Sequence, residues 1–589
     1  MADPSLHDAI HDSIYDSKPW TPAYGQAIQP KLPAPRYKNL ADLVAQACTR
    51  FAEKTAFTAV VPNGMNGSLS YAQLGELSDA FAVYLREVCG LKAGDRVAVQ
   101  LPNGLAYPIV AFGIFKSGCV LVNTNPLYTP SEMAHQFKDS GARVLVIVDM
   151  FVDKLAEVLP KTNIERVVLA GVSELFPALP NLIVRGVQKV WSKVLPPLPS
   201  VKQPIERLKS ALQLGRDAST PGKAQSYWQA VAAQDLVALQ YTGGTTGVSK
   251  GAMLTHANML ANVDQVLAMG KSHMGADECV LTALPLYHIF AFTANLLCFM
   301  DIGGRNILIP SPRPVQNLQR AIENYPITWI TGVNTLFNGL MNEEWFSAFP
   351  PKNLKAAIAG GTALHHAVGE RWQRMTNTRI AEGFGLTECS PVVTFNPLSG
   401  LAKPDSIGIP VPGTEVRLVD DAGQTVAQGE PGELIMRGPQ AMRGYWQRPD
   451  ETAAVVKDGW LYTGDVAVMD GQGYFKIVDR KKDLVLVSGF NVYPNEIEDA
   501  LAKMDAILEA AVVGVPDKRS GEAVRAYVVK NPDFAGELTQ EAVLAHCKKL
   551  LTDYKIPKSV VFRDDLPKSP VGKILRKDLK AEVKAEFKA

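Results

Sequence analysis

The sequence lacks the features that would place the chain in a membrane, in a secreted class or in a disulfide-bonded class. Its longest uncharged apolar run, residues 289–300, is too short to span a bilayer. Residues 1–20 are polar and acidic and contain no apolar segment of the kind found in signal peptides, so we do not expect secretion. The seven cysteines are scattered and include no C-x-x-C pair, which argues against a disulfide framework and against a zinc site. We therefore expect a reduced, cytoplasmic chain.

An excess of charge of one sign is also missing. The chain carries 60 basic and 59 acidic residues, a net charge of +1 at pH 7, so its bulk charge gives no reason to expect a nucleic-acid partner. Hydrophobic residues make up 47% and charged residues 20%, as in ordinary globular proteins. Because 589 residues exceed what one hydrophobic core organises, we expect about two to four structural units, with binding confined to local sites.

The stretch 241–252, YTGGTTGVSKGA, has the composition of an anion-binding site. It combines four glycines and four threonine or serine residues with a single lysine, Lys250. Glycine lets successive backbone N–H groups turn toward an anion, and the hydroxyls and the lysine add donors and charge. The stretch is not a Walker A loop, because Lys250 follows a serine where that motif has glycine. We predict a phosphate-binding loop that connects two strands, with Thr255 capping the next helix; a plain surface loop is the lesser alternative.

The pattern along the chain predicts an α/β protein with several units. Residues 1–38 carry six prolines and are expected to form an arm over the first domain. Residues 39–480 alternate helical patterns with apolar strand patterns, which is typical of β-α units around a mostly parallel sheet. This large N-terminal domain contains a proline-bearing, basic insertion at about 172–225 and a small β unit at about 405–480. Residues 481–589 are expected to form a small α+β C-terminal domain.

Within the insertion, residues 183–195 have helical periodicity with an apolar side and a basic side. The apolar residues are Ile183, Val187, Val190, Trp191 and Val194, and the basic residues are Arg185, Lys189 and Lys193. Such a helix can lie in a membrane interface, here on the inner face of the cell membrane. It can also pack on the protein and expose its charges to water, which is the commoner outcome and the one we favour slightly.

Two glycine-rich segments follow predicted strands. Gly361 lies at a strand end where glycine permits close approach of a ligand. In the segment GFGLTE, Phe384 can stack on a flat ring, and Thr387 with Glu388 can hold Mg²⁺ through oxygen ligands. Beside a phosphate-binding loop, these residues predict a nucleotide and metal site.

Two other residues are ambiguous when taken alone. His288 is a lone histidine on an apolar segment, where histidines are usually satisfied core residues. Lys573 follows a glycine-bearing turn in a basic C-terminal segment, and such segments are usually solvated. His365 and His366 are adjacent and therefore make a poor metal-binding pair.

Taken together and in order, these segments resemble the adenylate-forming superfamily of acyl-CoA synthetases, luciferases and peptide-synthetase adenylation domains. The similarity is greatest to long-chain fatty-acyl-CoA synthetases of bacterial type and runs from about residue 36 to near the end of the chain. It is carried by the motifs YTGGTTGVSKG, LPLYHIF, GFGLTE, DGWLYTGD, GYFKIVDRKKDLVLVSGFNVYPNEIE and LPKSPVGKILR. The block 458–482 looks like the fatty-acyl signature of that superfamily.

The resemblance implies a two-step reaction, with ATP and CoA as co-substrates and Mg²⁺ as cofactor. The carboxylate of a long-chain or medium-chain fatty acid attacks the α-phosphate of ATP, which gives acyl-adenylate and pyrophosphate. The thiolate of CoA then displaces AMP and gives the thioester. The protein's tasks are positioning and charge neutralisation, so no nucleophilic side chain is required.

The resemblance also implies roles for residues in binding ATP. It assigns the binding of the β- and γ-phosphates to Thr242, Gly243, Gly244, Thr245, Thr246, Gly247 and Lys250. It assigns the binding of adenine to Gly361 and Phe384, and that of the ribose hydroxyls to Asp465 and Arg480. Three departures from the superfamily pattern, Gly243 for serine, Val248-Ser249 for a Ser/Thr-Pro pair and Phe384 for tyrosine, remove no catalytic group.

For catalysis, the resemblance implies that Glu388 with Thr387 holds Mg²⁺ and the α-phosphate, and that Lys573 bridges the substrate carboxylate and the α-phosphate. It also implies that the C-terminal domain rotates about a hinge at Lys482 between the two steps. This rotation withdraws Lys573 and brings the loop with Gly489 to the CoA tunnel. His288 resembles the gate beside the acyl pocket, and the pocket itself is expected to use Tyr287, Phe290, Val333 and Thr335.

Two other functions stay open. An acyl-adenylate ligase that loads a carrier protein usually has an insertion near the hinge, and DRKKDLVLVSG shows none. A non-catalytic fatty-acid-binding protein on the same scaffold would not need Lys573, Glu388 and Asp465, which are all present. A homodimer is expected only by analogy.

Overall fold

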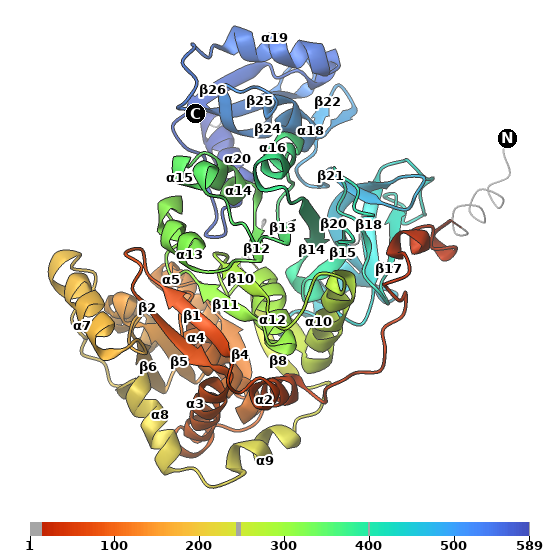
Figure 1. Ribbon diagram of the computed structural model, residues 1–589. Helices are drawn as coiled ribbons and strands as arrows, with labels where there is room; N and C mark the ends of the chain where they lie inside the picture. The colour runs from red at the N-terminus through yellow and green to blue at the C-terminus, as the bar shows by residue number, and fades with distance from the viewer. Residues whose placement is uncertain (1–13, 243–248, 399–400, 588–589) are drawn as a thin grey trace.

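The computed structural model describes residues 14–242, 249–398 and 401–587, which form four β-sheets with helices packed around them (Figure 1). The first three sheets end with the strand that closes at residue 480, and the fourth starts at residue 485. The expected fold class is confirmed: mixed α/β sheets in a large N-terminal domain, and a smaller C-terminal domain. Among the described residues, no helix combines the length and the apolar character needed to cross a bilayer.

The first sheet has the strand order β7-β6-β5-β3-β4-β8-β9 and is parallel apart from the antiparallel pair β8 and β9. Its strands are β3 (Arg96–Gln100), β4 (Val120–Asn123), β5 (Val144–Val148), β6 (Arg166–Ala170), β7 (Ile205–Arg207), β8 (Leu236–Thr242) and β9 (Lys250–Thr255). The accompanying helices are α2 (Leu40–Arg50), α3 (Tyr71–Val83), α4 (Ala106–Ser117), α5 (Pro130–Ser140), α6 (Leu155–Val158), α7 (Ala178–Gly186), α8 (Leu208–Asp217) and α9 (Lys223–Gln229). All residues of β5 are buried, as expected for a parallel strand covered on both faces.

The second sheet has the order β16-β15-β14-β13-β12-β10-β11-β1-β2. Its strands are β1 (Thr55–Val60), β2 (Asn66–Ser70), β10 (Cys279–Thr282), β11 (Arg305–Leu308), β12 (Trp329–Gly332), β13 (Ala356–Gly360), β14 (Ile380–Gly385), β15 (Val392–Phe395) and β16 (Ile409–Pro410). Its helices are α10 (His256–Gly270), α11 (Ile289–Ala291), α12 (Cys298–Ile302), α13 (Gln319–Asn324), α14 (Asn334–Met341), α15 (Glu344–Ala348) and α16 (His366–Thr376). Because β12, β13 and β14 are parallel, their carboxyl ends open on the same edge of the sheet.

The third sheet is a small antiparallel unit. Its strands are β17 (Glu415–Val419), β18 (Gly432–Arg437), β19 (Val456–Lys457), β20 (Trp460–Met469) and β21 (Phe475–Arg480), with α17 (Pro449–Val455) beside them. The N-terminal arm lies mainly on this unit, next to β17 in Figure 1. The ring of Trp20 packs against Phe475 with centroids 6.0 Å apart, and the Tyr24 hydroxyl donates to the carbonyl of Pro410 at 2.7 Å.

The fourth sheet forms the core of the C-terminal domain, at the top of Figure 1. Its strands are β22 (Val485–Val487), β23 (Phe490–Val492), β24 (Ile507–Asp517), β25 (Gly521–Lys530) and β26 (Ser559–Arg563), and its helices are α18 (Pro494–Leu501), α19 (Gln540–Leu550) and α20 (Arg576–Glu586). Strand β26 runs parallel to β25, and the other pairs are antiparallel. The limits drawn from sequence at residues 38, 405 and 480 stay predictions.

The local sequence explains which elements flank the glycine-rich stretch. Strands β8 and β9 pair antiparallel on either side of it, so the predicted strand-to-strand connection is confirmed. The Thr255 hydroxyl accepts from the N–H of Asn258 at 3.1 Å, so the predicted cap of the following helix is confirmed too. Residues 243–248 themselves lie outside the described residues.

Candidate active site

Lys250 and Thr242 lie opposite each other at the open end of the β8–β9 pair, where they are register partners. The Lys250 ammonium is 2.5 Å from a carboxylate oxygen of Glu451 and lies 5.2 Å from the ring centre of Tyr445. The predicted phosphate ligands Gly243, Gly244, Thr245, Thr246 and Gly247 lie outside the described residues. The two ends of the loop therefore place one threonine and one cation at this edge of the first sheet.

Glu388 lies in a 3₁₀ turn, Thr387–Cys389, just after β14. The Tyr445 hydroxyl donates to its Oε1 at 2.6 Å. Burial and the charge of Glu388 raise the pKa of Tyr445 well above its usual value, so the hydroxyl stays protonated and can donate. Tyr445 thus touches both Lys250 and Glu388, and joins the predicted phosphate loop to the predicted metal carboxylate. The sequence analysis did not identify Tyr445.

The donor set around Glu388 consists of one carboxylate and the neighbouring Thr387 hydroxyl. Among the described residues, no group of three or more histidine, cysteine, aspartate or glutamate side chains is placed to hold a metal. Magnesium is usually bound by one or two carboxylates together with substrate phosphates, not by an all-protein cage. A single oriented carboxylate beside the ends of a phosphate loop fits that mode, with Thr387 as its neighbour in the same turn.

Gly361 and Phe384 come from the carboxyl ends of neighbouring strands, since Gly360 of β13 pairs with Gly383 of β14. Gly361 has φ +80°, and a Cβ built on it would have no heavy atom within 4 Å. The backbone there faces open space, so a flat ring can approach it closely. The structure therefore brings these two predicted adenine-binding residues to one edge of the second sheet.

Asp465 and Arg480 are register partners on β20 and β21. Nε of Arg480 lies 3.0 Å from Oδ1 of Asp465. Burial raises the pKa of Asp465, and the charges of Arg480 and Lys573 oppose that shift. The charge of Lys573, a residue of the C-terminal domain, thus acts on a carboxylate of the large domain.

Lys573 is carried by a tight turn just before α20. The N–H of Gly572 donates to the Ser569 carbonyl at 2.9 Å, and the N–H of Ser569 donates to the Lys573 carbonyl at 2.7 Å. Gly572 has φ +91°, which favours glycine at this position. Burial, with a smaller contribution from Arg480, lowers the pKa of Lys573 to about 7. The residue is half-buried, and its charged form is disfavoured in this position.

His288 caps the short helix α11 (Ile289–Ala291), where its Nδ1 accepts from the N–H of Phe290 at 3.4 Å. Burial, with a smaller contribution from Lys573, lowers the pKa of His288 to about 4. The ring is therefore neutral at pH 7, and its role as a gate stays a prediction.

The four residues expected in the acyl pocket fall into two pairs. The Tyr287 carbonyl accepts from Gln240 of β8 at 2.7 Å, and a Cβ built on Gly360 would lie 3.2 Å from the Phe290 ring. Thr335 instead donates to the Gly572 carbonyl at 3.2 Å, and Val333 lies against the same glycine. The first pair lies near the adenine edge and the second under the Lys573 turn; their role in an acyl tunnel stays a prediction.

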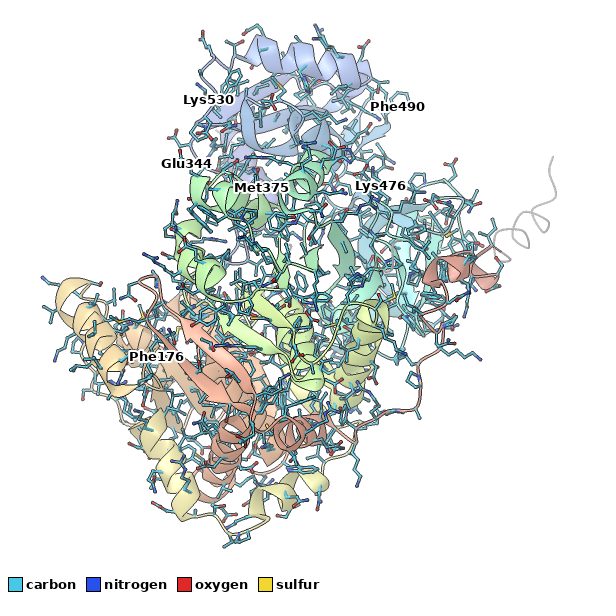
Figure 2. All side chains as sticks on the ribbon, viewed as in Figure 1. Phe176, Glu344, Met375, Lys476, Phe490 and Lys530 are labelled. Atoms are coloured by element: carbon cyan, nitrogen blue, oxygen red, sulfur yellow. The ribbon has the colours of Figure 1, made fainter. Side chains whose placement is uncertain are left out.

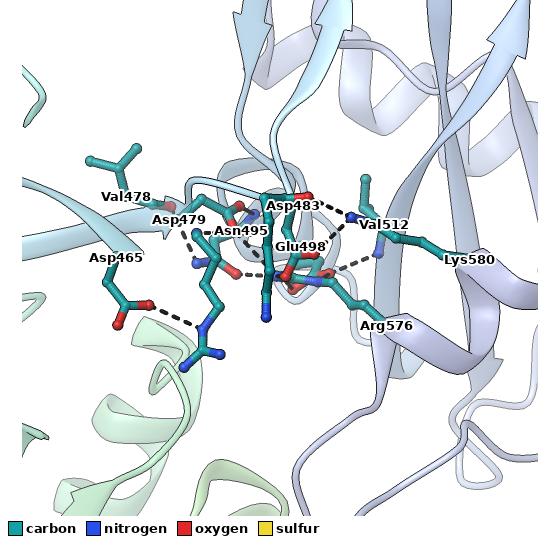
Figure 3. Close-up of polar contacts among 11 residues, drawn as sticks. Asp465, Val478, Asp479, Asp483, Asn495, Glu498, Val512, Arg576 and Lys580 are labelled. Carbon is teal, nitrogen blue, oxygen red and sulfur yellow. Dashed lines mark hydrogen bonds and ion pairs between the residues drawn. The ribbon is translucent and has the colours of Figure 1, made fainter. Parts of the chain in front are cut away.

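The segment around Lys482 connects the two domains through a charged cluster (Figure 3). Arg576 of α20 lies 3.2 Å from Asp479 of β21 and 2.6 Å from Glu498 of α18. Lys580 donates to the Lys482 carbonyl at 3.0 Å and lies 2.7 Å from Asp483. This cluster surrounds the expected hinge and was not identified from the sequence.

Gly489, expected at the CoA tunnel, lies far from this arrangement. It forms the β22–β23 turn with φ +85°, and a Cβ built on it would meet no atom within 4 Å. Its neighbour Phe490 is exposed at the outer edge of the C-terminal domain (Figure 2). The role of Gly489 at a CoA tunnel and the rotation between the two steps stay predictions.

Comparison with known families agrees with this geometry. Residues 44–446 match the family model described as AMP-binding enzyme, and residues 496–573 match the model described as AMP-binding enzyme C-terminal domain. These two matches together cover the glycine-rich loop, Glu388 and Lys573.

Known proteins are similar to the chain over nearly its whole length. The long-chain-fatty-acid–CoA ligase of Salmonella typhimurium is 46% identical over 572 residues, which cover 97% of this chain and 99% of that protein. The ligase of the same description from Yersinia pestis is 47% identical over 568 residues, or 96% and 98% of the two chains. Among solved structures, ATP-bound MatB from Rhodopseudomonas palustris superposes with a TM-score of 0.77 at 27% identity and covers 93% of this chain and 99% of its own.

Proposed function

The chain belongs to the AMP-binding enzyme family, and from that premise we propose that it is a long-chain-fatty-acid–CoA ligase. It activates a fatty acid with ATP to acyl-adenylate and pyrophosphate, and transfers the acyl group to CoA with release of AMP. The observation that carries this proposal is the turn that carries Lys573, which the C-terminal domain holds against Thr335 and Val333 of the large domain. A cation at that point suits the joining of two anions, a carboxylate and a phosphate.

In the first step, the residues act by position and charge. The Lys573 ammonium neutralises the carboxylate and the α-phosphate as they approach. Lys250 and the glycine-rich loop hold the β- and γ-phosphates, which leave as pyrophosphate. Asp465 and Arg480 fix the ribose, and Gly361 with Phe384 bracket adenine. Mg²⁺ held by Glu388 would supply positive charge to the phosphates.

The proposal is tested by measuring AMP release and thioester formation with acids from acetate to oleate, with CoA and without it. We expect CoA-dependent AMP release with long-chain acids. Thioester formation confined to short or aromatic acids would refute the fatty-acid assignment. Transfer to a carrier protein but not to CoA would point instead to the carrier-loading ligase.

The chain also carries a surface suited to a membrane that contains anionic lipid. The helical segment 178–191 exposes between 38% and 73% of five large apolar side chains: Leu179, Leu182, Ile183, Val187 and Val190. Val184, on another side of the same helix, is buried, so the helix packs on the domain and leaves this stripe partly open to solvent. The stripe lies on α7 and on the π-helical turn Val187–Trp191 that follows it, and α7 is at an outer edge of the large domain in Figure 1.

Charge around the stripe has one sign. Residues 175–205 contain no aspartate or glutamate but include Arg185, Lys189, Lys193 and Lys202. Arg185 is paired with Asp149 at 3.1 Å, and the three lysines are exposed. Apolar side chains flanked by lysines are the composition of interfacial helices that bind anionic bilayers. We therefore propose that the enzyme docks on such a bilayer, where its fatty-acid substrate partitions.

The docking surface is tested by sedimentation with anionic and with zwitterionic vesicles. We expect Leu179→Ser with Leu182→Ser to weaken binding to anionic vesicles about tenfold or more, because each buried leucine contributes about 2 kcal/mol. The matched control is Phe349→Ser, an equally exposed apolar residue on another part of the domain. Unchanged sedimentation, or concentration-dependent self-association through the same stripe, would overturn the proposal, the latter in favour of a homodimer.

A further inference from the structure

Arg313 lies outside the motifs that carry the proposed reaction, yet it touches the turn that carries Lys573. Its Nη2 donates to the carbonyl oxygens of Ser569 at 3.1 Å and Pro570 at 2.9 Å. Arg313 follows β11 of the large domain, whereas the turn belongs to the C-terminal domain. We propose that Arg313 is a positioning residue that holds the C-terminal domain in the orientation that forms acyl-adenylate. This inference rests on the proposed two-step ligase reaction.

Arg313 donates most of the hydrogen bonds that the large domain makes to the turn. The described residues of the large domain donate three hydrogen bonds to residues 569–572, and two of them come from Arg313. The third runs from the Thr335 hydroxyl to the Gly572 carbonyl at 3.2 Å. The turn also packs closely against the large domain, because a Cβ built on Gly572 would lie 3.1 Å from Val333.

The two acceptors of Arg313 are backbone carbonyls, so the contact depends on where the turn is and not on which side chains it carries. When the C-terminal domain rotates to withdraw Lys573, these carbonyls move with it. Arg313 belongs to the other domain and stays behind. The two hydrogen bonds therefore stabilise one orientation only, which is the condition for a contact to shift the balance between two orientations.

A few hydrogen bonds can matter here because no apolar core joins the two domains. Among the described residues, every cluster of buried apolar side chains lies wholly before or wholly after the hinge: four clusters have no buried member beyond residue 475, and the other two have none before residue 485. The domains instead meet through polar pairs, such as His365 with Asp499 at 2.8 Å and Arg576 with Asp479 at 3.2 Å. Loss of Arg313 therefore removes a sizeable part of the few polar contacts that join the two domains.

The test measures the two half-reactions separately. Acyl-adenylate formation is followed by fatty-acid-dependent pyrophosphate exchange, and thioester formation by adding CoA to supplied acyl-adenylate. We expect Arg313→Met to lower the rate of adenylate formation about tenfold, the effect of losing about 1.4 kcal/mol of hydrogen bonding. Thioester formation is not slowed, and the KM for ATP is nearly unchanged. Arg313→Lys retains a donor on a similar stem and restores part of the rate.

The matched control is Arg320→Met, which removes another exposed arginine whose ion pair, with Glu323, stays within the same helix region. A thermal melt checks that Arg313→Met is folded, as expected for an exposed side chain. Equal loss of both half-reactions in a folded variant, or normal adenylate formation, would overturn the inference. Failure of the wild type to adenylate any fatty acid would overturn the proposed function instead; the same comparison is then made with whichever acid the wild type does adenylate.

Discussion

The lowered pKa of Lys573 leads to a prediction about how adenylate formation depends on pH. The charged ammonium is the form that can neutralise the carboxylate and the α-phosphate, and its pKa in the ligand-free site is about 7. The value of kcat/KM reports ionisations of the free enzyme. We therefore expect kcat/KM for ATP in the first step to be full below pH 7 and to fall as pH rises through 7.

The same pKa sets the size of the expected fall in kcat/KM. With a pKa of about 7, roughly one tenth of Lys573 is charged at pH 8 and roughly one hundredth at pH 9, which corresponds to about 1.4 kcal/mol per pH unit. Bound ATP brings negative charge beside the amine and favours its charged form. The fall in kcat should therefore occur at higher pH than the fall in kcat/KM.

The assay is pyrophosphate exchange between pH 6 and 9 with wild type and with Lys573→Arg. Arginine keeps its charge over this range, so the variant, although slower, should show no fall near pH 7. Thioester formation from supplied acyl-adenylate serves as the control and should rise with pH, because the thiolate is the nucleophile. If the exchange rate of Lys573→Arg falls with the same midpoint pH as that of the wild type, the ionisation belongs to another group. A flat wild-type profile up to pH 9 would refute the burial argument.

Three further predictions concern other contacts. Tyr445→Phe removes the hydrogen bond to Glu388, so the Mg²⁺ concentration for half-maximal adenylation should rise about tenfold, measured by Mg²⁺ titration. Asp465→Asn should raise the KM for ATP about tenfold in steady-state kinetics, while an equal rise in the KM for the acid would contradict a role at ribose. Gly473→Ala forces a Cβ to within 2.4 Å of the Trp20 backbone at φ +81°, so thermal unfolding should show a loss of about 1–3 kcal/mol, with the adenylation rate at low temperature unchanged in the folded protein.

Local sequence patterns were enough to predict the elements that carry the nucleotide site. The alternation of apolar and polar residues predicted strands on both sides of the glycine-rich loop, and the hydroxyl of Thr255 predicted the next helix start. Gly361 and Phe384 could be assigned to strand ends because glycines mark the points where the chain leaves the sheet. These predictions depend on neighbours a few residues apart, which a single sequence displays directly.

Contacts between distant segments could not be predicted in this way. Tyr445 is 57 residues from Glu388, and Arg313 is 256 residues from Ser569. In the sequence, the tyrosine lies in an undistinguished turn and the arginine between two prolines. Each acquires its role only when the sheets and the C-terminal domain are assembled. The sequence left open whether the apolar side of residues 183–195 is exposed, because periodicity shows that a helix has an apolar side but not whether anything covers it.

The charges around Lys573 connect the end of the first step to the rotation that follows. In the ligand-free site, burial disfavours the charged form of Lys573 most, Arg480 and Arg576 add to that effect, and Asp465 only partly offsets it. We expect the phosphates of ATP to reverse that balance and so to favour the orientation that brings Lys573 in. When pyrophosphate leaves, most of the negative charge leaves with it. The Lys573 amine is then again repelled by Arg480 and Arg576. The orientation then depends on hydrogen bonds such as those of Arg313, which are weak enough to break without exposing an apolar core. We therefore expect rotation to follow pyrophosphate release, and added pyrophosphate to slow thioester formation more in the wild type than in Arg313→Met.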